Sequence, residues 1–125
     1  MIWVVIINIS KNIQRQMAGF LSQEALNKLK AAVDSGHLPK VQDLTNQGFP
    51  EGIAHHLADH LTYSKELHEK NILKGGGPCA RSEKAILIFE CDTEEEVRGY
   101  VEEDPYYKNG IFIKPYDIYN WHKIF

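Results

Sequence analysis

The order in which apolar strand segments and amphipathic helices follow one another constrains the fold of this chain most strongly. The apolar periodicities predict the following elements: strand 2–9, helix 53–70, strand 73–80, strand 84–91, helix 94–103 and strand 111–119. This β-α-β-β-α-β order is the α+β, ferredoxin-like plan, in which four antiparallel strands carry two helices on one face. The other face has no helix to cover it. Two such sheets packed face to face would bury it, so we expect a homodimer.

A long segment, residues 11–52, separates the first strand from the helix at 53–70. Within it, Ser22 is a suitable N-cap and Gly36 a suitable C-terminal stop, so we expect a helix between them. The apolar face of that helix would consist of Leu26, Leu29 and Val33. Prolines and glycines punctuate residues 37–52, which predicts a loop there. We therefore expect residues 1–125 to form one domain with a helical insertion at about 11–52.

Length and charge exclude several classes of protein. A chain of 125 residues buries roughly two-thirds of its unfolded surface, so it needs no disulfide or metal to fold. The net charge of −3 argues against nucleic-acid binding, because no basic field is present to neutralise phosphates. The apolar run Met1–Ile7 is too short to span a bilayer, and it has no positive flank typical of a signal peptide. We expect a cytoplasmic protein without membrane attachment.

The two cysteines, Cys79 and Cys91, are not expected to form a disulfide. A hairpin that turns at Arg81–Lys84 sets Cys79 opposite about Ile86, at the far end from Cys91. Neither thiol has an activating cation beside it in the sequence, so both are predicted to be core or edge residues.

His60 is the first candidate for chemistry, because it falls among the apolar residues of its helix. At 100° per residue, one stripe of the helix holds Ile53, Leu57, His60, Leu61, Ser64, Leu67 and His68. Two imidazoles, those of His60 and His68, therefore point with the core-facing side chains. His60 is either a core-edge residue satisfied by a backbone carbonyl or a general base in a pocket.

Asp104 is the second candidate, and it also has two interpretations. An Asp before Pro105 is a good N-cap for a short helical turn through Tyr106 and Tyr107. Alternatively, its carboxylate orients the His60 ring and stabilises the charged form of the imidazole.

Two other patterns resemble binding motifs without matching them. His56 and His60 are four residues apart and share a helix face, but no third metal ligand is evident and no Glu follows His56. The run Gly75–Pro78 lacks the Lys-Ser/Thr of a phosphate-binding loop. Its glycines allow a β-bulge or the close approach of a ligand to the backbone. We predict no metal site.

Several short motifs, taken in order, resemble the YciI-like (YCII-related) family. They are His60-Leu61, Leu67–Leu73, Gly77-Pro78, Asp104-Pro105-Tyr106 and Ile113–Tyr116. The resemblance covers residues 53–125 and the first strand. It implies a dimeric α/β barrel in which His60 and Asp104 form a catalytic pair. The same motifs hold the expected substrate-binding residues, which are His68, Gly77, Pro78 and Tyr106.

The resemblance also implies a reaction class. Assigned members and relatives act on small aromatic, quinol or lactone compounds without a cofactor, so we expect a lyase or isomerase that uses general acid/base chemistry. The alternative is a non-catalytic dimeric module that binds a small ligand or a partner. The segment 11–52 favours this alternative, because the family usually has a short link there. The segment would act as a lid or extend the dimer.

Overall fold

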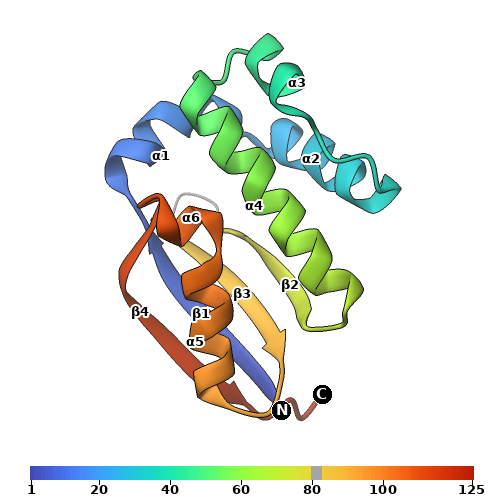
Figure 1. The fold of residues 1–125 in the computed structure, drawn as a ribbon, viewed down its shortest axis with the longest axis vertical. Coiled ribbons are helices and arrows are strands. Elements are labelled where there is room, and N and C mark those ends of the chain that lie inside the picture. Colours follow the sequence, from blue (N-terminus) through green and yellow to red (C-terminus); the bar gives the residue numbers. More distant parts are fainter. Residues whose placement is uncertain (80–82) are drawn as a thin grey trace.

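The computed structural model describes residues 1–79 and 83–125 of the chain, and its centre is an antiparallel sheet of four strands. The strands are β1 (Ile2–Ile9), β2 (Leu73–Pro78), β3 (Lys84–Glu90) and β4 (Phe112–Trp121). They lie in the order β2-β3-β1-β4, and every neighbouring pair is antiparallel (Figure 1). The predicted ferredoxin-like, α+β plan is confirmed, with β1 as a central strand.

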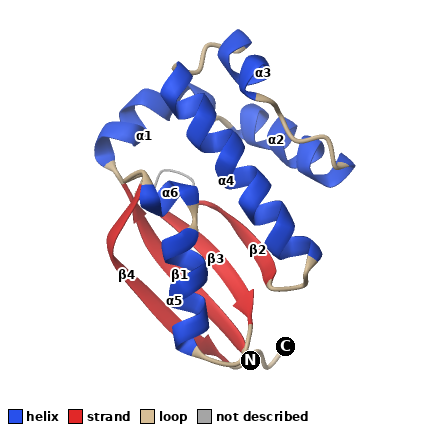
Figure 2. Cartoon of the chain, viewed as in Figure 1, coloured by secondary structure: helices blue, strands red, loops and turns tan. Residues whose placement is uncertain are grey.

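Two long helices complete the plan. They are α4 (Glu51–Glu69) and α5 (Glu94–Glu103), and a single turn, α6 (Pro105–Lys108), follows α5. Figure 2 shows α5 in front of the sheet and α4 running beside it toward β2. One core forms from both helices and one face of the sheet, and it includes Val5, Ile7, Ile53, Leu57, Leu87, Phe89, Val97 and Val101. The alternation of buried and less buried residues along β1 and β3 follows from the two-residue period of a strand.

The predicted helix caps are confirmed where the sequence carries a local signal. α2 (Gln23–Ser35) begins after Ser22, whose Oγ accepts the Ala25 N–H at 3.1 Å. It ends at Gly36 with φ 78°, a left-handed conformation that glycine adopts without strain. α5 has a cap of the same kind, for which the sequence offered either Asp92 or Thr93, and it is Thr93 that accepts the Glu96 N–H at 3.2 Å. These contacts satisfy backbone groups that the helices leave free at their ends.

The segment 11–52 is more helical than the sequence indicated. It contains α1 (Lys11–Met17), the 3₁₀ turn η1 (Ala18–Phe20), α2 and α3 (Val41–Asn46). The prediction of a loop at 37–52 was wrong, because α3 lies within it and α4 begins at Glu51. The Asp43 carboxylate accepts the Lys40 N–H at 3.0 Å and so caps α3, while Leu44 fixes α3 in the core. In Figure 1, α2 and α3 lie along the side of α4 away from the sheet.

The β2–β3 hairpin differs in register from the prediction. The Cys79 N–H donates to the Lys84 carbonyl at 2.9 Å, so Cys79 lies opposite Lys84 and not Ile86. The predicted turn at Arg81–Lys84 lies partly outside the described residues. Both cysteines are free.

The glycine run has a structural explanation in the same hairpin. The register shifts between Leu73 and Gly75, which is the irregularity that glycines were expected to permit. A Cβ at Gly76 would meet Leu87 Cδ2 at 3.1 Å, a contact that requires the leucine to move. Glycine at this position therefore lets β2 pair closely with β3.

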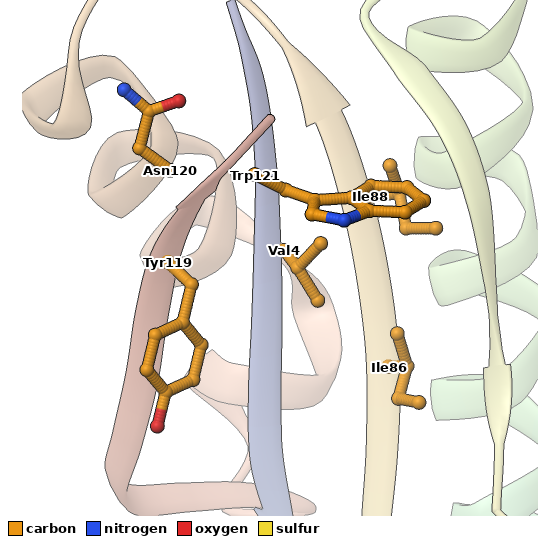
Figure 3. Close-up of a pocket in the computed structure, with 6 residues that line it drawn as sticks. All are labelled: Val4, Ile86, Ile88, Tyr119, Asn120 and Trp121. Atoms are coloured by element: carbon orange, nitrogen blue, oxygen red, sulfur yellow. The ribbon is translucent and has the colours of Figure 1, made fainter. Parts of the chain in front are cut away.

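The face of the sheet turned away from the helices is apolar and exposed. Figure 3 shows the residues that line a shallow hollow on it, which are Val4, Ile86, Ile88, Tyr119, Asn120 and Trp121. The hollow has a volume of about 440 Å³. Large side chains remain open to solvent there, since Tyr119 is 54% and Trp121 45% exposed. In the described part of the chain, no helix is long and apolar enough to cross a membrane.

Candidate active site

His60 and Asp104 meet, although they are 44 residues apart in the sequence. His60 lies in the middle of α4, and its Nδ1 is 2.7 Å from Asp104 Oδ1 and 3.0 Å from Oδ2. Only 14% of the imidazole and 5% of the carboxylate is exposed. An ionised carboxylate only accepts hydrogen bonds, so the proton of this bond belongs to Nδ1. In a neutral imidazole with this proton on Nδ1, Nε2 is the nitrogen with a free lone pair.

Asp104 makes a contact that belongs to each of the two interpretations left open by the sequence. It stands between α5 and α6, and its Oδ1 accepts the Tyr106 N–H at 2.9 Å as the N-cap of α6. The same carboxylate binds the His60 ring. Pro105 at the first position of α6 lacks an N–H, so no backbone donor is lost there. The Asp104 carboxylate is therefore both the N-cap of α6 and the hydrogen-bond partner of His60.

Two aromatic rings enclose the imidazole. The Tyr106 ring is parallel to it, with centroids 3.8 Å apart and an interplanar angle of 4°. Phe112, at the start of β4, meets the imidazole edge-on at 5.5 Å. Burial, followed by the charge of Asp104, raises the pKa of Tyr106, so the phenol is neutral at neutral pH.

Tyr63 is a residue of this region that the sequence reasoning did not assign to the site. Its hydroxyl donates to the Tyr100 carbonyl at 2.6 Å, which ties α4 to the last turn of α5. Tyr63 lies three residues after His60, and Tyr100 lies four residues before Asp104. Burial, and then the charge of Asp104, raises the pKa of Tyr63, so it remains a hydrogen-bond donor. The sequence did carry a signal for Tyr63, because a residue three positions after His60 lies on the same face of the helix.

The remaining predicted contacts lie apart from the pair. His68 is exposed, contrary to the expectation that it points with the core, and its Nδ1 lies 2.9 Å from the Leu73 carbonyl oxygen. Eight residues separate it from His60, which is about 12 Å along the helix axis. Gly77 and Pro78 form the exposed end of β2. Contact of these three residues with a substrate stays a prediction.

The histidines near the start of α4 do not form a metal site with other side chains that the structure describes. His55 is mostly exposed and lies 4.0 Å from Glu51, while His56 is half-buried. Across residues 1–79 and 83–125, no group of three or more His, Cys, Asp or Glu side chains is placed to hold a metal ion. His60, which shares a helix face with His56, is hydrogen-bonded to Asp104.

The structure thus combines a ferredoxin-like α+β fold with a contact between a partly buried histidine and a buried carboxylate. The chain belongs to the YCII-related domain family, whose model matches residues 1–122. The resemblance inferred from the short motifs is confirmed, and the match runs through the segment 11–52.

A solved structure with a similar fold is the 5-chloro-2-hydroxyhydroquinone dehydrochlorinase of Burkholderia phenoliruptrix, in complex with 2,5-dihydroxybenzoquinone. The TM-score is 0.55 at 19% sequence identity, and the alignment covers 98% of this chain and 94% of that chain. At this identity the likeness supports the fold. A search of curated proteins gave no significant match.

Proposed function

We propose that this protein is a small-molecule enzyme of the lyase or isomerase type, with His60 as its general base and Asp104 as the residue that orients the imidazole. The observation that carries the proposal is the hydrogen bond of 2.7 Å from His60 Nδ1 to Asp104 Oδ1. It leaves Nε2 as the basic nitrogen and sets a negative charge where the imidazolium would form. A positioned base of this kind contributes roughly 10²–10⁴-fold to a rate.

The proposed reaction begins when Nε2 takes a proton from a carbon or hydroxyl of the substrate. The electron pair of the broken bond stays on the substrate, as an enolate or a new double bond from a C–H and as an oxyanion from an O–H, and Asp104 stabilises the imidazolium. In an elimination, a leaving group departs with its bonding electrons, and Nε2 afterwards releases its proton to solvent. In an isomerisation, Nε2 returns the proton to another carbon. Neither route needs a cofactor.

The proposed substrate class is a small ring compound with hydroxyl or carbonyl groups. Two observations support it. The imidazole lies in an apolar surrounding of Tyr106 and Phe112, which suits a flat molecule. The dehydrochlorinase of similar fold holds a dihydroxybenzoquinone. Oxygen atoms on a ring acidify neighbouring protons and accept the electron pair that proton removal leaves.

A thermal-shift screen tests this proposal. Wild type is heated with phenols, quinols, lactones and carboxylic acids, beside His60→Ala and the control His55→Ala, which alters an exposed histidine of the same helix. A ligand at 100 times its Kd stabilises the fold by about 2.7 kcal/mol, so we expect a ring compound to raise Tm. The rise should persist in His55→Ala and weaken in His60→Ala. Stabilisation that is equal in all three proteins would contradict a pocket at His60.

We also propose a homodimer that forms by packing the open sheet faces together, in the cytoplasm. The apolar hollow between β1, β3 and β4 and the exposure of Trp121 and Tyr119 support the dimer. Burying such a surface against a second copy removes it from water at both partners. The two free thiols, Cys79 and Cys91, are compatible with a reducing compartment.

Ile88→Asp is expected to convert the dimer to a monomer, because Ile88 lines the hollow and a carboxylate there would be buried without a partner. We expect a cost of roughly 2 kcal/mol or more, about thirtyfold in the dimer dissociation constant. Light scattering across a dilution series measures it against the 14.3 kDa chain mass. The control is Val33→Asp on α2, at an exposed apolar residue of another surface. A monomeric wild type would overturn the proposal.

The alternative function is a binding module without catalysis. α2 has no buried residue, and both Val33 of its apolar face and Leu21 just before the helix are exposed. This observation favours a surface that contacts another molecule. Under this alternative, a ligand raises Tm in the screen, but wild type leaves every stabilising compound chemically unchanged.

A further inference from the structure

The His60 imidazole is held on more than one side. Its Nδ1 is fixed by Asp104, and one of its two faces lies flat against Tyr106 at 3.8 Å. Phe112 stands perpendicular to both rings, 5.5 Å from His60 and 5.1 Å from Tyr106. Rotation of the imidazole about its bond to Cβ would break the parallel stack and the hydrogen bond together. The ring therefore has one preferred orientation.

Tyr106 also acts on the other member of the pair. Its backbone N–H donates to Asp104 Oδ1, the oxygen that is 2.7 Å from His60 Nδ1. The carbonyl of Tyr106 in turn accepts the Ile111 N–H at 2.8 Å, which anchors the end of α6 to the segment before β4. One residue thus fixes the carboxylate through its backbone and the imidazole through its side chain.

We infer that Tyr106 is a positioning residue, which sets the angle of the His60 ring so that Nδ1 meets Asp104 and Nε2 is presented to the substrate. This role rests on the proposed function, and the substrate contact of Tyr106 expected from the sequence stays a separate prediction. Because His60 covers one face of the Tyr106 ring, no substrate stacks on that face. Proton transfer depends steeply on alignment, and a displacement of about 1 Å costs on the order of 100-fold in rate.

The first test compares three variants in turnover. Tyr106→Leu removes the stacking ring and keeps the backbone N–H, so we expect kcat to fall roughly tenfold or more while KM changes less than about twofold. Tyr106→Phe keeps the ring and should recover most of the loss. The control is Tyr107→Leu, since the neighbouring ring packs on Tyr116 at 6.0 Å and not on His60. Unchanged kcat in a folded Tyr106→Leu would overturn the inference.

The second test needs neither a substrate nor a folded variant at Tyr106. A ring stacked at 3.8 Å shields the protons on its neighbour, so the His60 imidazole protons of wild type should resonate upfield of those of a free imidazole. Their loss in His60→Gln assigns them in the NMR spectrum. Signals at free-imidazole positions would overturn the stacked arrangement. If shielding is seen but no compound is turned over, the proposed function has failed and the ring arrangement has not.

Discussion

Replacing His60 with alanine is expected to lower kcat by roughly 10²–10⁴-fold, because the variant lacks the only group to which we assign the proton transfer. His60→Gln is expected to lose as much activity, since an amide is not a base. Glutamine carries an N–H that is able to reach Asp104, so it should preserve more stability than alanine does. Steady-state turnover and urea denaturation of both variants measure the two effects.

The control for His60 is again His55→Ala, which should turn over substrate at the wild-type rate. His55 lies on the same helix, but its side chain is 56% exposed and faces Glu51. If His60→Gln kept more than about a tenth of the wild-type kcat, general base catalysis by this imidazole would be untenable, given the factor that such bases supply.

Two substitutions at Asp104 are expected to separate its two roles. Asp104→Asn keeps an oxygen for the Tyr106 N–H, so α6 remains capped and stability falls little. The retained Oδ1 lies 2.7 Å from His60 Nδ1, whereas the new amide nitrogen takes the place of Oδ2 and carries no negative charge. The imidazolium formed in proton transfer then loses its charged partner, so we expect kcat to fall roughly 10²–10⁴-fold. Activity near the wild-type level in a folded Asp104→Asn would contradict the orienting role.

Asp104→Ala should lose the cap as well as the activity. The Tyr106 N–H and the His60 Nδ1–H would both remain without their acceptor in a region where Asp104 is only 3% exposed. Loss of a cap and of a charged acceptor costs about 1–3 kcal/mol in unfolding free energy. Urea denaturation of the two variants gives the difference directly, and equal stability of the Ala and Asn forms would contradict the capping contact.

Features that depend on neighbouring residues were predictable from the sequence. Ser22 and Gly36 begin and end α2 through contacts within a few residues, and the structure has both. The strands followed from their apolar periods in the same way. β4 extends to Trp121, two residues past the predicted end, because Trp121 still pairs with Ile2 at the start of β1.

Features that depend on packing were not predictable. α3 is a six-residue helix flanked by Pro39 and Gly48, so its sequence has the composition of a loop. It persists because Leu44 is buried against the core and because Phe20 and Phe49 stack at 3.8 Å. The β2–β3 register was also predicted wrongly. The apolar periodicity of the strands indicates neither the bulge after Leu73 nor the length of the connection between them.

The candidate site was predictable in part. The helix pattern placed His60 toward the core, and the motif Asp104-Pro105 indicated a cap. Their contact depends on how the end of α5 meets the middle of α4, which no local signal contains. The same holds for the stack of Tyr106 on His60 and for the tie from Tyr63 to Tyr100. His68 was predicted to face the core but is exposed. The apolar stripe of a helix does not indicate at which residue the helix stops packing against the rest of the protein.

The most direct test of the central claim is exchange of substrate protons with solvent. Ring compounds from the thermal-shift screen are incubated in D₂O with wild type, His60→Gln and His55→Ala, and the loss of each C–H signal is followed by NMR. General base catalysis by His60 predicts exchange or conversion of at least one compound by wild type and His55→Ala, and none above background by His60→Gln. Exchange by His60→Gln at the wild-type rate would contradict the account.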